Sequence, residues 1–375
     1  MNLEFSEEQT LLRDSVARFV KSNYSLDKRR EIVRSPTGFS PDHWKSMGDL
    51  GWLALPFSEA DGGLGGTPIE TMIVMEQFGA GLVVEPFFAS IVLGGSALRH
   101  GASRKLKDEL LSGVMDGSQQ LAFAHSEDQA RFDLENVSSV ARRDADQFVL
   151  NGAKSFVLNA ASASHFIVSA RTAGEAADAR GITLFVVPAN SEGLSVQAYP
   201  TVDGLRAAEL TLKDVRVPAS RVLGNVDAGL EILSAVSNAA ILALGAEAVG
   251  AMDVLFRDTV EYTQQRVQFD HPLSDFQVLQ HRMVDMFVEY ELTKSLLYRA
   301  TLEATQASPE AQRSIHALKY QIGKAGSFIG ENAVQLHGGM GMTEALRIGH
   351  YFKRLVVVDL QFGNADYHLR KLAGL

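Results

Sequence analysis

The sequence predicts an α+β fold in three consecutive parts: a helical domain at residues 1–117, a central β-sheet domain at residues 118–224 and a four-helix bundle at residues 225–375. Three observations predict this order. Apolar residues recur at helical spacing in the first third, short β-prone runs fill the middle, and long amphipathic stretches return in the last third. A chain of 375 residues, 46% apolar and 21% charged, is long enough to bury such a layered core.

The first third carries clear helix start signals. Ser6 and Gln9 form a capping-box pattern ahead of apolar residues at helical spacing, so a helix is expected to begin after Ser6. Thr67 and Pro68 predict a second start, because a hydroxyl residue at the N-cap and proline in the first turn favour helix initiation, and Gly79 predicts its end. Further helical patterns cover residues 86–99 and 104–115.

The apolar period changes near residue 121. Short runs rich in β-branched and aromatic residues, separated by Asp, Asn, Gly and Pro, are typical of strands. The expected strands are residues 121–124, 139–142, 147–150, 155–158, 166–170, 182–187 and 209–212. From about residue 226, proline becomes rare and amphipathic stretches return, which predicts long helices. The four expected helices are residues 228–265, 275–305, 309–336 and 344–372.

Composition excludes several function classes. A net charge of −10 provides no basic surface of the kind that nucleic-acid-binding proteins use, so no nucleic-acid partner is expected. Because the chain has no cysteine, it has no disulfides, thiolate metal sites or cysteine nucleophiles. It also has no H-E-x-x-H zinc motif, and no metal is expected. No signal-peptide pattern and no sufficiently long apolar segment are recognised, so a cytoplasmic location without a membrane span is expected.

Five short elements, in order along the chain, resemble motifs of the acyl-CoA dehydrogenase family. They are Leu50-Gly51-Trp52 with Gly62-Gly63, Phe123 through Asp133, Asn151-Gly152-Ala153-Lys154, Arg266 through Phe269, and Gln335 through Thr343. The resemblance covers nearly the whole chain. It implies the three-domain acyl-CoA dehydrogenase fold, an FAD cofactor, and removal of two hydrogens across the α,β-bond of an acyl-CoA thioester. The family further implies a tetramer, and electron-transfer flavoprotein or a similar acceptor as a partner.

The resemblance assigns cofactor-binding residues in the bundle. Arg266, Gln268 and Phe269 lie in an element that resembles R-x-x-F-G, whose arginine pairs with the FAD pyrophosphate of a neighbouring subunit; a guanidinium suits a diphosphate because it offers parallel donors. Asp270 stands where the family has glycine, and its carboxylate opposes a diphosphate. A further polar contact is expected at Gln277. Gln335, Gly338 and Gly339 match a Q-x-x-G-G segment, where glycines permit close backbone approach to the adenosine diphosphate half.

In the sheet domain, the resemblance points to the flavin ring. Ser126 keeps a hydroxyl for the flavin pyrimidine edge, but Phe132 replaces the serine that touches coenzyme A. The family's W-I-T stretch reads Phe156-Val157-Leu158, so Phe156 can pack on the isoalloxazine while Leu158 cannot donate to N5. For Phe156 and Leu158, the reading as ordinary strand core residues stays equally open.

The usual catalytic carboxylate is missing. Desaturation needs a base to take the α-proton, and the family's common positions for it read Phe362 and Ala240 here, with Ile241 in place of an arginine that contacts coenzyme A. The nearest carboxylate on the same helix face is Glu247, in an otherwise apolar helix, which makes it the candidate base. The alternative is a buried glutamate hydrogen-bonded to a neighbouring helix.

Three functions follow from these observations. The favoured one is a subunit of a hetero-oligomeric acyl-CoA dehydrogenase, in which a homologous subunit provides the base; such subunits are known in the family for pimeloyl-CoA and steroid side-chain substrates. Fatty acid or steroid catabolism is therefore expected. The second is an autonomous acyl-CoA dehydrogenase with Glu247 as the base. The third is a non-catalytic scaffold of the same fold, against which the retained Arg266 and Gln335 count.

Overall fold

The computed structural model describes residues 4–374, in which the chain forms two compact units. Among the described residues, one unit comprises residues 4–31, Pro68–Val83 and residues 241–374, and it contains the helical bundle. The other comprises Ile32–Thr67 and Val84–Ala240, and it contains the large sheet. Helices, then a sheet, then helices follow one another along the chain, so the α+β class is confirmed. The expected domain boundaries at residues 117 and 224 stay a prediction.

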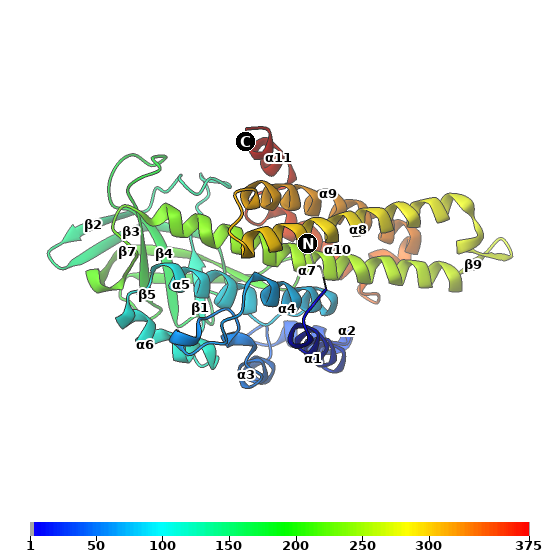
Figure 1. The fold of residues 1–375 in the computed structure, drawn as a ribbon, viewed down its shortest axis with the longest axis horizontal. Coiled ribbons are helices and arrows are strands. Elements are labelled where there is room, and N and C mark those ends of the chain that lie inside the picture. The colour runs from blue at the N-terminus through cyan, green and yellow to red at the C-terminus, as the bar shows by residue number, and fades with distance from the viewer. Residues whose placement is uncertain (1–3, 375) are drawn as a thin grey trace. The chain divides into compact units, whose positions relative to one another are not determined.

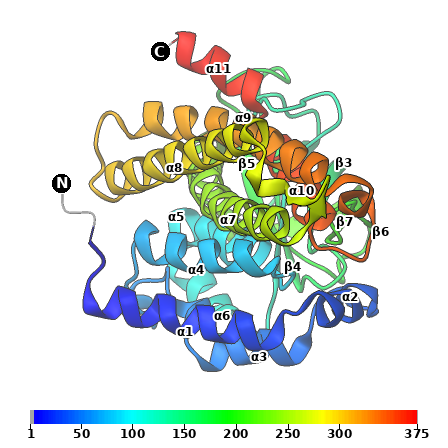
Figure 2. The same ribbon diagram turned by 90° about the vertical axis from the view of Figure 1, so that its right-hand side faces the viewer.

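Within residues 4–374, five α-helices of the bundle unit come from the C-terminal third of the chain, and Figures 1 and 2 show α8 and α9 side by side in it. The five are α7 (Gly229–Gln265, whose first residues belong to the sheet unit), α8 (Gln277–Thr305), α9 (Ala311–His337), α10 (Ile348–Leu360) and α11 (Ala365–Gly374). Three more helices come from the N-terminal third, namely α1 (Glu7–Asn23), α4 (Pro68–Gly81) and the first part of α2 (Leu26–Arg34).

The expected start of the first helix is confirmed. Ser6 caps α1, its Oγ accepts a hydrogen bond from the Gln9 amide, and the Gln9 side chain accepts one from the Ser6 amide. These reciprocal bonds satisfy two amides that a helix start would otherwise leave without partners.

Helices α4 and α7 approach backbone to backbone because both have glycine at the contact. A Cβ atom at Gly79 would lie 1.9 Å from the Glu247 carbonyl oxygen, and one at Gly250 would lie 1.9 Å from the Glu76 carbonyl oxygen. A side chain at either position would push the helices apart. The contact fixes the segment of α7 that carries Glu247.

The long helix expected at residues 344–372 is instead two helices, α10 and α11. The chain turns at residues 361–364, where Phe362 and Gly363 have φ angles of 56° and 101°. Lys319, buried on α9, stabilises this turn, because its Nζ donates to the carbonyl oxygens of Val358, Asp359 and Gly363 at 2.7–3.0 Å. Burial lowers the pKa of Lys319 to about 8.

The sheet unit is built on an eight-stranded, largely antiparallel sheet with the order β6-β7-β3-β2-β4-β5-β8, and β1 pairs with β4 in parallel. The strands are β1 (Leu121–Ala124), β2 (Val140–Asp144), β3 (Gln147–Leu158), β4 (His165–Arg171), β5 (Ile182–Pro188), β6 (Leu194–Pro200), β7 (Arg206–Pro218) and β8 (Val222–Leu223). Fully buried Phe166, Phe185 and Leu210 lie in its core. Two expected strands, at residues 147–150 and 155–158, are the two ends of β3.

The same unit contains α3 (Pro41–Asp49), a π-helix at Phe87–Gly95, α5 (Ser96–Gly101) and α6 (Arg104–Met115). The expected helix at residues 104–115 coincides with α6. The one expected at residues 86–99 begins as a π-helix and continues into α5.

One described helix, α7, is long and apolar enough to cross a membrane by length and composition, so the expectation that no segment reaches that threshold was wrong. An 18-residue window of α7 has a mean hydropathy of 1.8, but 78% of that window is buried inside the protein. A core helix that is covered on all sides has the same composition as a membrane span, which explains the result.

Candidate flavin and thioester site

The end of the bundle brings two of the motif elements together. Tyr262, near the end of α7, stacks on His337, the last residue of α9, with ring centroids 4.2 Å apart and an interplanar angle of 26°. The Tyr262 hydroxyl also donates to the His337 carbonyl oxygen at 3.5 Å. Because Arg266 follows Tyr262 by one helical turn and Gly338 follows His337 directly, both elements lie at the same end of the bundle.

Arg266 is exposed, and no residue in the range 4–374 forms a hydrogen bond or an ion pair with its guanidinium. The arginine is therefore available to an external anion. A short hairpin follows it, made of β9 (Val267–Gln268) and β10 (His271–Pro272). Gln268 is exposed in this hairpin, and its Nε2 donates to the Val267 carbonyl oxygen at 2.8 Å.

Phe269 lies at the tip of the hairpin and presents its ring to solvent. The residue is 84% exposed and has a φ of 55°, and its only described ring contact is an edge contact with Phe276 at 6.2 Å. A large aromatic ring held outward in a left-handed conformation is not stabilised by the chain itself, which favours a role in contact with another molecule. Asp270 shares the tip with a φ of 66°, and Gln277 is exposed at the start of α8.

Gly338 and Gly339 follow α9, and the chain leaves the space around them open. Gly338 has φ 59° and ψ −144°, a conformation that is essentially confined to glycine. No atom lies within 4 Å of a Cβ atom built at either glycine. For Gly339, packing within the described chain therefore gives no reason for glycine, whereas close approach of an external group does. Gln335 is exposed one turn earlier, and its carbonyl oxygen accepts a hydrogen bond from the Gly338 amide.

In the sheet unit, Ser126 and Phe156 lie on two segments that are hydrogen-bonded to each other. The Ser155 amide donates to the Ser126 carbonyl oxygen at 2.9 Å. Phe156 occupies an irregularity in the β3–β7 pairing, has a φ of 53° and is 39% exposed, while the next residue, Val157, is buried. The Phe156 ring is thus presented outward, which favours the platform role over the core role. Its amide faces Glu209 at 3.5 Å, and Glu209 accepts a 2.7 Å hydrogen bond from Tyr199.

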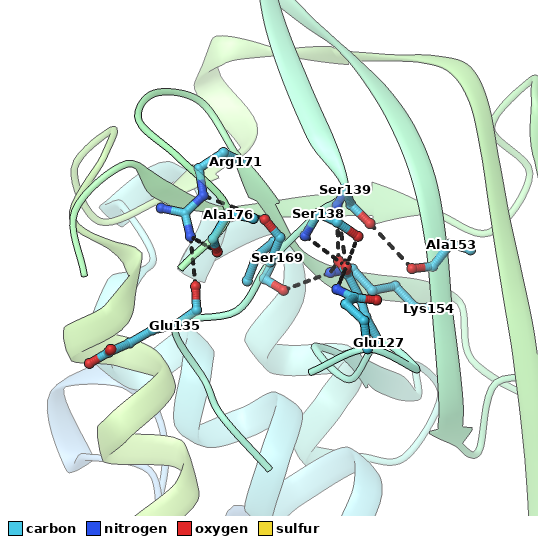
Figure 3. A network of polar contacts seen from close by, with 11 residues as sticks. Glu127, Glu135, Ser138, Ser139, Ala153, Lys154, Ser169, Arg171 and Ala176 are labelled. Carbon is cyan, nitrogen blue, oxygen red and sulfur yellow. Dashed lines mark hydrogen bonds and ion pairs between the residues drawn. The ribbon is translucent and has the colours of Figure 1, made fainter. Parts of the chain in front are cut away.

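A buried ion pair lies between these two segments and was not foreseen from the sequence. Lys154 Nζ donates to Glu127 Oε1 at 2.5 Å and to Ser169 Oγ at 3.0 Å, and Figure 3 shows the carboxylate of Glu127 at the centre of the network. The amides of Ser138 and Ser139 also donate to Glu127, at 2.8 and 3.1 Å. Burial opposes charge on both side chains, but the ammonium and these donors hold the pKa of Glu127 well below its ordinary value.

Glu247, the candidate base, is already engaged. Its two carboxylate oxygens accept hydrogen bonds from Arg354 Nε and Nη2 at 2.6 and 2.7 Å, and both side chains are buried. This geometry favours the alternative of a buried glutamate bonded to a neighbouring helix. A catalytic role for Glu247 stays a prediction. It requires the carboxylate to break its hydrogen bonds to Arg354 and to accept the α-proton of the substrate instead.

The other two expected base positions offer no carboxylate. Phe362 lies in the turn between α10 and α11, and Ala240 is fully buried in α7 with Ile241 beside it. Among residues 4–374, no group of three or more histidine, aspartate or glutamate side chains could hold a metal ion.

A cavity of about 60 Å³ in the sheet unit lies beside the segment that includes Phe156. It is mainly apolar, and the residues that line it include Phe39, Phe88, Leu158 and Arg206. Glu85 also contributes to its wall, although its side chain is fully buried and turned to the start of α3, where Oε1 accepts from the Ser40 amide at 3.2 Å. Burial raises the pKa of Glu85 to about 7.

Comparison with known proteins identifies the family of this chain. Three family models match in order: the N-terminal domain of acyl-CoA dehydrogenase at residues 6–118, its middle domain at 122–215 and its C-terminal domain at 227–374. The probable acyl-CoA dehydrogenase YngJ of Bacillus subtilis strain 168 is 27% identical over 372 residues, which are 98% of this chain and 97% of that protein.

Two solved structures are similar over almost the whole chain. The FAD complex of PigA has a TM-score of 0.93 and 26% identity, covering 100% of this chain and 98% of that one. A variant of the Tcur3481-Tcur3483 steroid acyl-CoA dehydrogenase has a TM-score of 0.88 and 26% identity, covering 98% and 97%. With all three domain models matched in order, the chain belongs to the acyl-CoA dehydrogenase family of oxidoreductases, as its motifs predict.

Proposed function

We propose that this chain is one subunit of a hetero-oligomeric, FAD-dependent acyl-CoA dehydrogenase, which converts an acyl-CoA thioester to the 2-enoyl-CoA. The observation that carries the proposal is a contrast between two places in the bundle. Groups suited to a diphosphate remain open at its end, whereas every carboxylate position expected of the base is either replaced or engaged.

The residues present fit FAD. Arg266 would hold the pyrophosphate through charge-assisted donors, and Gly338 and Gly339 leave room for the adenosine diphosphate half beside Gln335. Phe269 would cover a face of the bound nucleotide. In the sheet unit, Ser126 would bond the pyrimidine edge and Phe156 would pack on the ring. When bound, FAD supplies the hydride acceptor that no side chain can supply.

The chain's own residues bind and orient rather than abstract the proton. In this proposal, a homologous partner subunit provides the base, and the partner's FAD contacts the exposed bundle end of this chain. The similarity to a paired steroid acyl-CoA dehydrogenase supports this arrangement. A four-subunit assembly, an electron-transfer flavoprotein or similar acceptor, a role in fatty acid or steroid catabolism and a cytoplasmic location complete the proposal.

The test is co-purification from the native source, with mass spectrometry for a second chain of the family and an absorbance spectrum for bound flavin. We expect both a homologous partner and the absorbance of an oxidised flavin. Flavin on a homo-oligomer with no second chain would support the autonomous enzyme, for which the buried Glu247 is the available carboxylate. Absence of flavin from both the isolated chain and the complex would support the scaffold.

A further inference from the structure

The buried pair Glu127 and Lys154 has a position that its effect on stability does not explain. Glu127 directly follows Ser126, and Lys154 precedes Phe156 by two residues. The pair therefore joins the two segments that carry the expected flavin contacts of the sheet unit, a loop after β1 and an irregular stretch of β3.

The hydrogen bonds around the pair fix backbone rather than side chains alone. Glu127 accepts hydrogen bonds from the amides of Ser138 and Ser139 and from the Gln129 side chain. These bonds join the start of the loop that follows β1 to its end before β2. The Ser139 hydroxyl donates to the Ala153 carbonyl oxygen at 3.2 Å, next to Lys154. The Ser155 amide then donates to the Ser126 carbonyl oxygen. Each link restricts either the segment of Ser126 or that of Phe156.

A buried ion pair of this kind contributes little net stability to a fold. Only 0% of the Lys154 side chain and 2% of the Glu127 side chain are exposed. When opposite charges are buried in this way, the cost of removing them from water offsets most of their attraction. Apolar residues of similar volume would stabilise a core at least as well. Ion pairs do supply a defined geometry, because a carboxylate with several donors accepts them only in one arrangement.

We propose that the ion pair of Glu127 and Lys154 is a positioning device that holds the backbone at Ser126 and Phe156 in the arrangement that the flavin ring requires. The inference rests on the proposed function, since it needs a flavin on this wall. Neither residue touches the reacting atoms in this assignment; both act through the two segments they join.

The experiment compares four proteins, each purified with the partner subunit that accompanies the native chain. They are the wild type, Lys154→Met, the double variant Glu127→Leu with Lys154→Met, and the control Arg171→Met. Arg171 is the control because it is also a buried cation of the same sheet. Its guanidinium donates to the carbonyl oxygens of Glu135, Val137, Ala176, Asp178 and Arg180, none of which belongs to the segments of Ser126 and Phe156; Figure 3 shows the bonds to Glu135 and Ala176.

Three quantities are measured: the unfolding midpoint, the FAD dissociation constant with the flavin absorption spectrum, and hydrogen–deuterium exchange of residues 124–133 and 155–158. Lys154→Met should lower the midpoint, weaken FAD binding by on the order of tenfold and speed exchange in both segments. In the double variant the midpoint should recover in part, because neither charge of the pair remains buried although the Ser138 and Ser139 amides lose an acceptor, while FAD binding and the spectrum stay altered. Arg171→Met should lower the midpoint and leave the flavin spectrum unchanged.

Recovery of FAD affinity together with the midpoint in the double variant would overturn the inference, because the pair would then act through stability alone. Wild-type affinity in Lys154→Met would overturn it as well. If the wild-type complex holds no flavin, both the proposed function and this inference fail. The flavin absorption spectrum of the wild type distinguishes this outcome from the two outcomes that overturn the inference alone.

Discussion

Glu247 on α7 and Arg354 on α10 form a two-pronged buried ion pair, with donor–acceptor distances of 2.6 and 2.7 Å. The two residues are 107 positions apart in the sequence, and only 6% and 3% of their surfaces are exposed. The pair joins the helix that contacts α4 to the helix that leads into the Phe362 turn. Its geometry is that of a structural contact between helices.

Replacing Glu247 by glutamine should therefore destabilise the bundle. The Arg354 guanidinium would remain buried without this carboxylate, and breaking such a pair costs about 3–5 kcal/mol of unfolding free energy. Urea unfolding followed by circular dichroism at 222 nm measures it. The double variant Glu247→Leu with Arg354→Met should regain most of the loss. A single variant as stable as the wild type would contradict the structural role.

Removing the Arg266 side chain should lower FAD occupancy. The guanidinium is exposed and has no partner among the described residues, so Arg266→Ala should leave helical circular dichroism unchanged while weakening diphosphate binding. Occupancy is read as the ratio of flavin to protein absorbance in the purified complex. Arg282→Ala, at another exposed arginine of the bundle, is the control. Unchanged occupancy in Arg266→Ala would remove this residue from the site.

Phe156→Ala should alter the flavin spectrum. The ring is 39% exposed and is held outward by a left-handed backbone, so its loss would remove a surface on which isoalloxazine can pack. The measurement is the position and shape of the flavin absorption bands. Val196→Ala, on β6 and equally exposed, provides a matched truncation. If the two variants have identical spectra, Phe156 does not contact the flavin.

Glu85 predicts how stability depends on pH. Its pKa rises from 4.5 to about 7 on folding because of burial, so the folded state holds this proton more strongly than the unfolded state. The resulting stabilisation is complete below pH 4.5, falls as the pH rises toward 7 and is lost above that value. The contribution of Glu85 to the free energy of unfolding should fall by about 3 kcal/mol in total.

The contribution of Glu85 is isolated by comparing urea unfolding of the wild type and Glu85→Gln at pH 5.5 and pH 8. Glutamine carries no titrating proton and can still accept the bond from the Ser40 amide. The free energy of unfolding of Glu85→Gln, relative to that of the wild type, should therefore be higher at pH 8 than at pH 5.5. Glu59→Gln, at an exposed glutamate, should not change this difference. A wild type that gains stability between the two pH values relative to Glu85→Gln would refute the assignment.

Much of the fold follows from local signals in the sequence. The Ser6 capping box and the apolar period of α6 predict element ends that the structure confirms. Helix α3 begins with Ser40 and Pro41, a hydroxyl residue followed by proline like Thr67 and Pro68 of α4, and could have been found in the same way. Helix α2 is mostly charged and lacks an apolar stripe, so its stability depends on tertiary contacts such as the buried Arg29, which donates to the Leu82 carbonyl oxygen.

What the sequence could not supply depends on distant partners and on backbone conformation. Helix α10 ends at Leu360, and Phe362 in the turn that follows has a φ of 56°, a conformation that a phenylalanine in the sequence does not indicate. The motif residues at the bundle end were predicted by resemblance, but their exposure and the stacking of Tyr262 on His337 required the fold. Lys154 lies in a strand pattern that does not reveal its burial, so its pairing with Glu127 had no sequence signal.

The thioester side of the site has lost several groups at once. Phe362 and Ala240 occupy the two usual base positions, Ile241 and Phe132 replace contacts to coenzyme A, and Leu158 replaces the donor to flavin N5. The bundle end keeps Arg266 open, and Glu247 is engaged with Arg354. This pattern is expected of a subunit that contributes groups to a neighbour's flavin site and whose own thioester cavity is incomplete.

The isolated chain should therefore show little or no acyl-CoA dehydrogenase activity, and a homologous partner should restore it. Loss of a general base costs on the order of 10²–10⁴-fold in rate, so the difference is easily measured. Homogeneous protein, reconstituted with FAD and an artificial electron acceptor, is assayed with and without the partner against pimeloyl-CoA, medium-chain and steroid side-chain thioesters. Because Glu247→Gln also weakens the bundle, its activity is compared at a temperature where it stays folded. Robust turnover by the isolated wild type, together with no turnover by folded Glu247→Gln, would contradict the subunit proposal and establish Glu247 as the base.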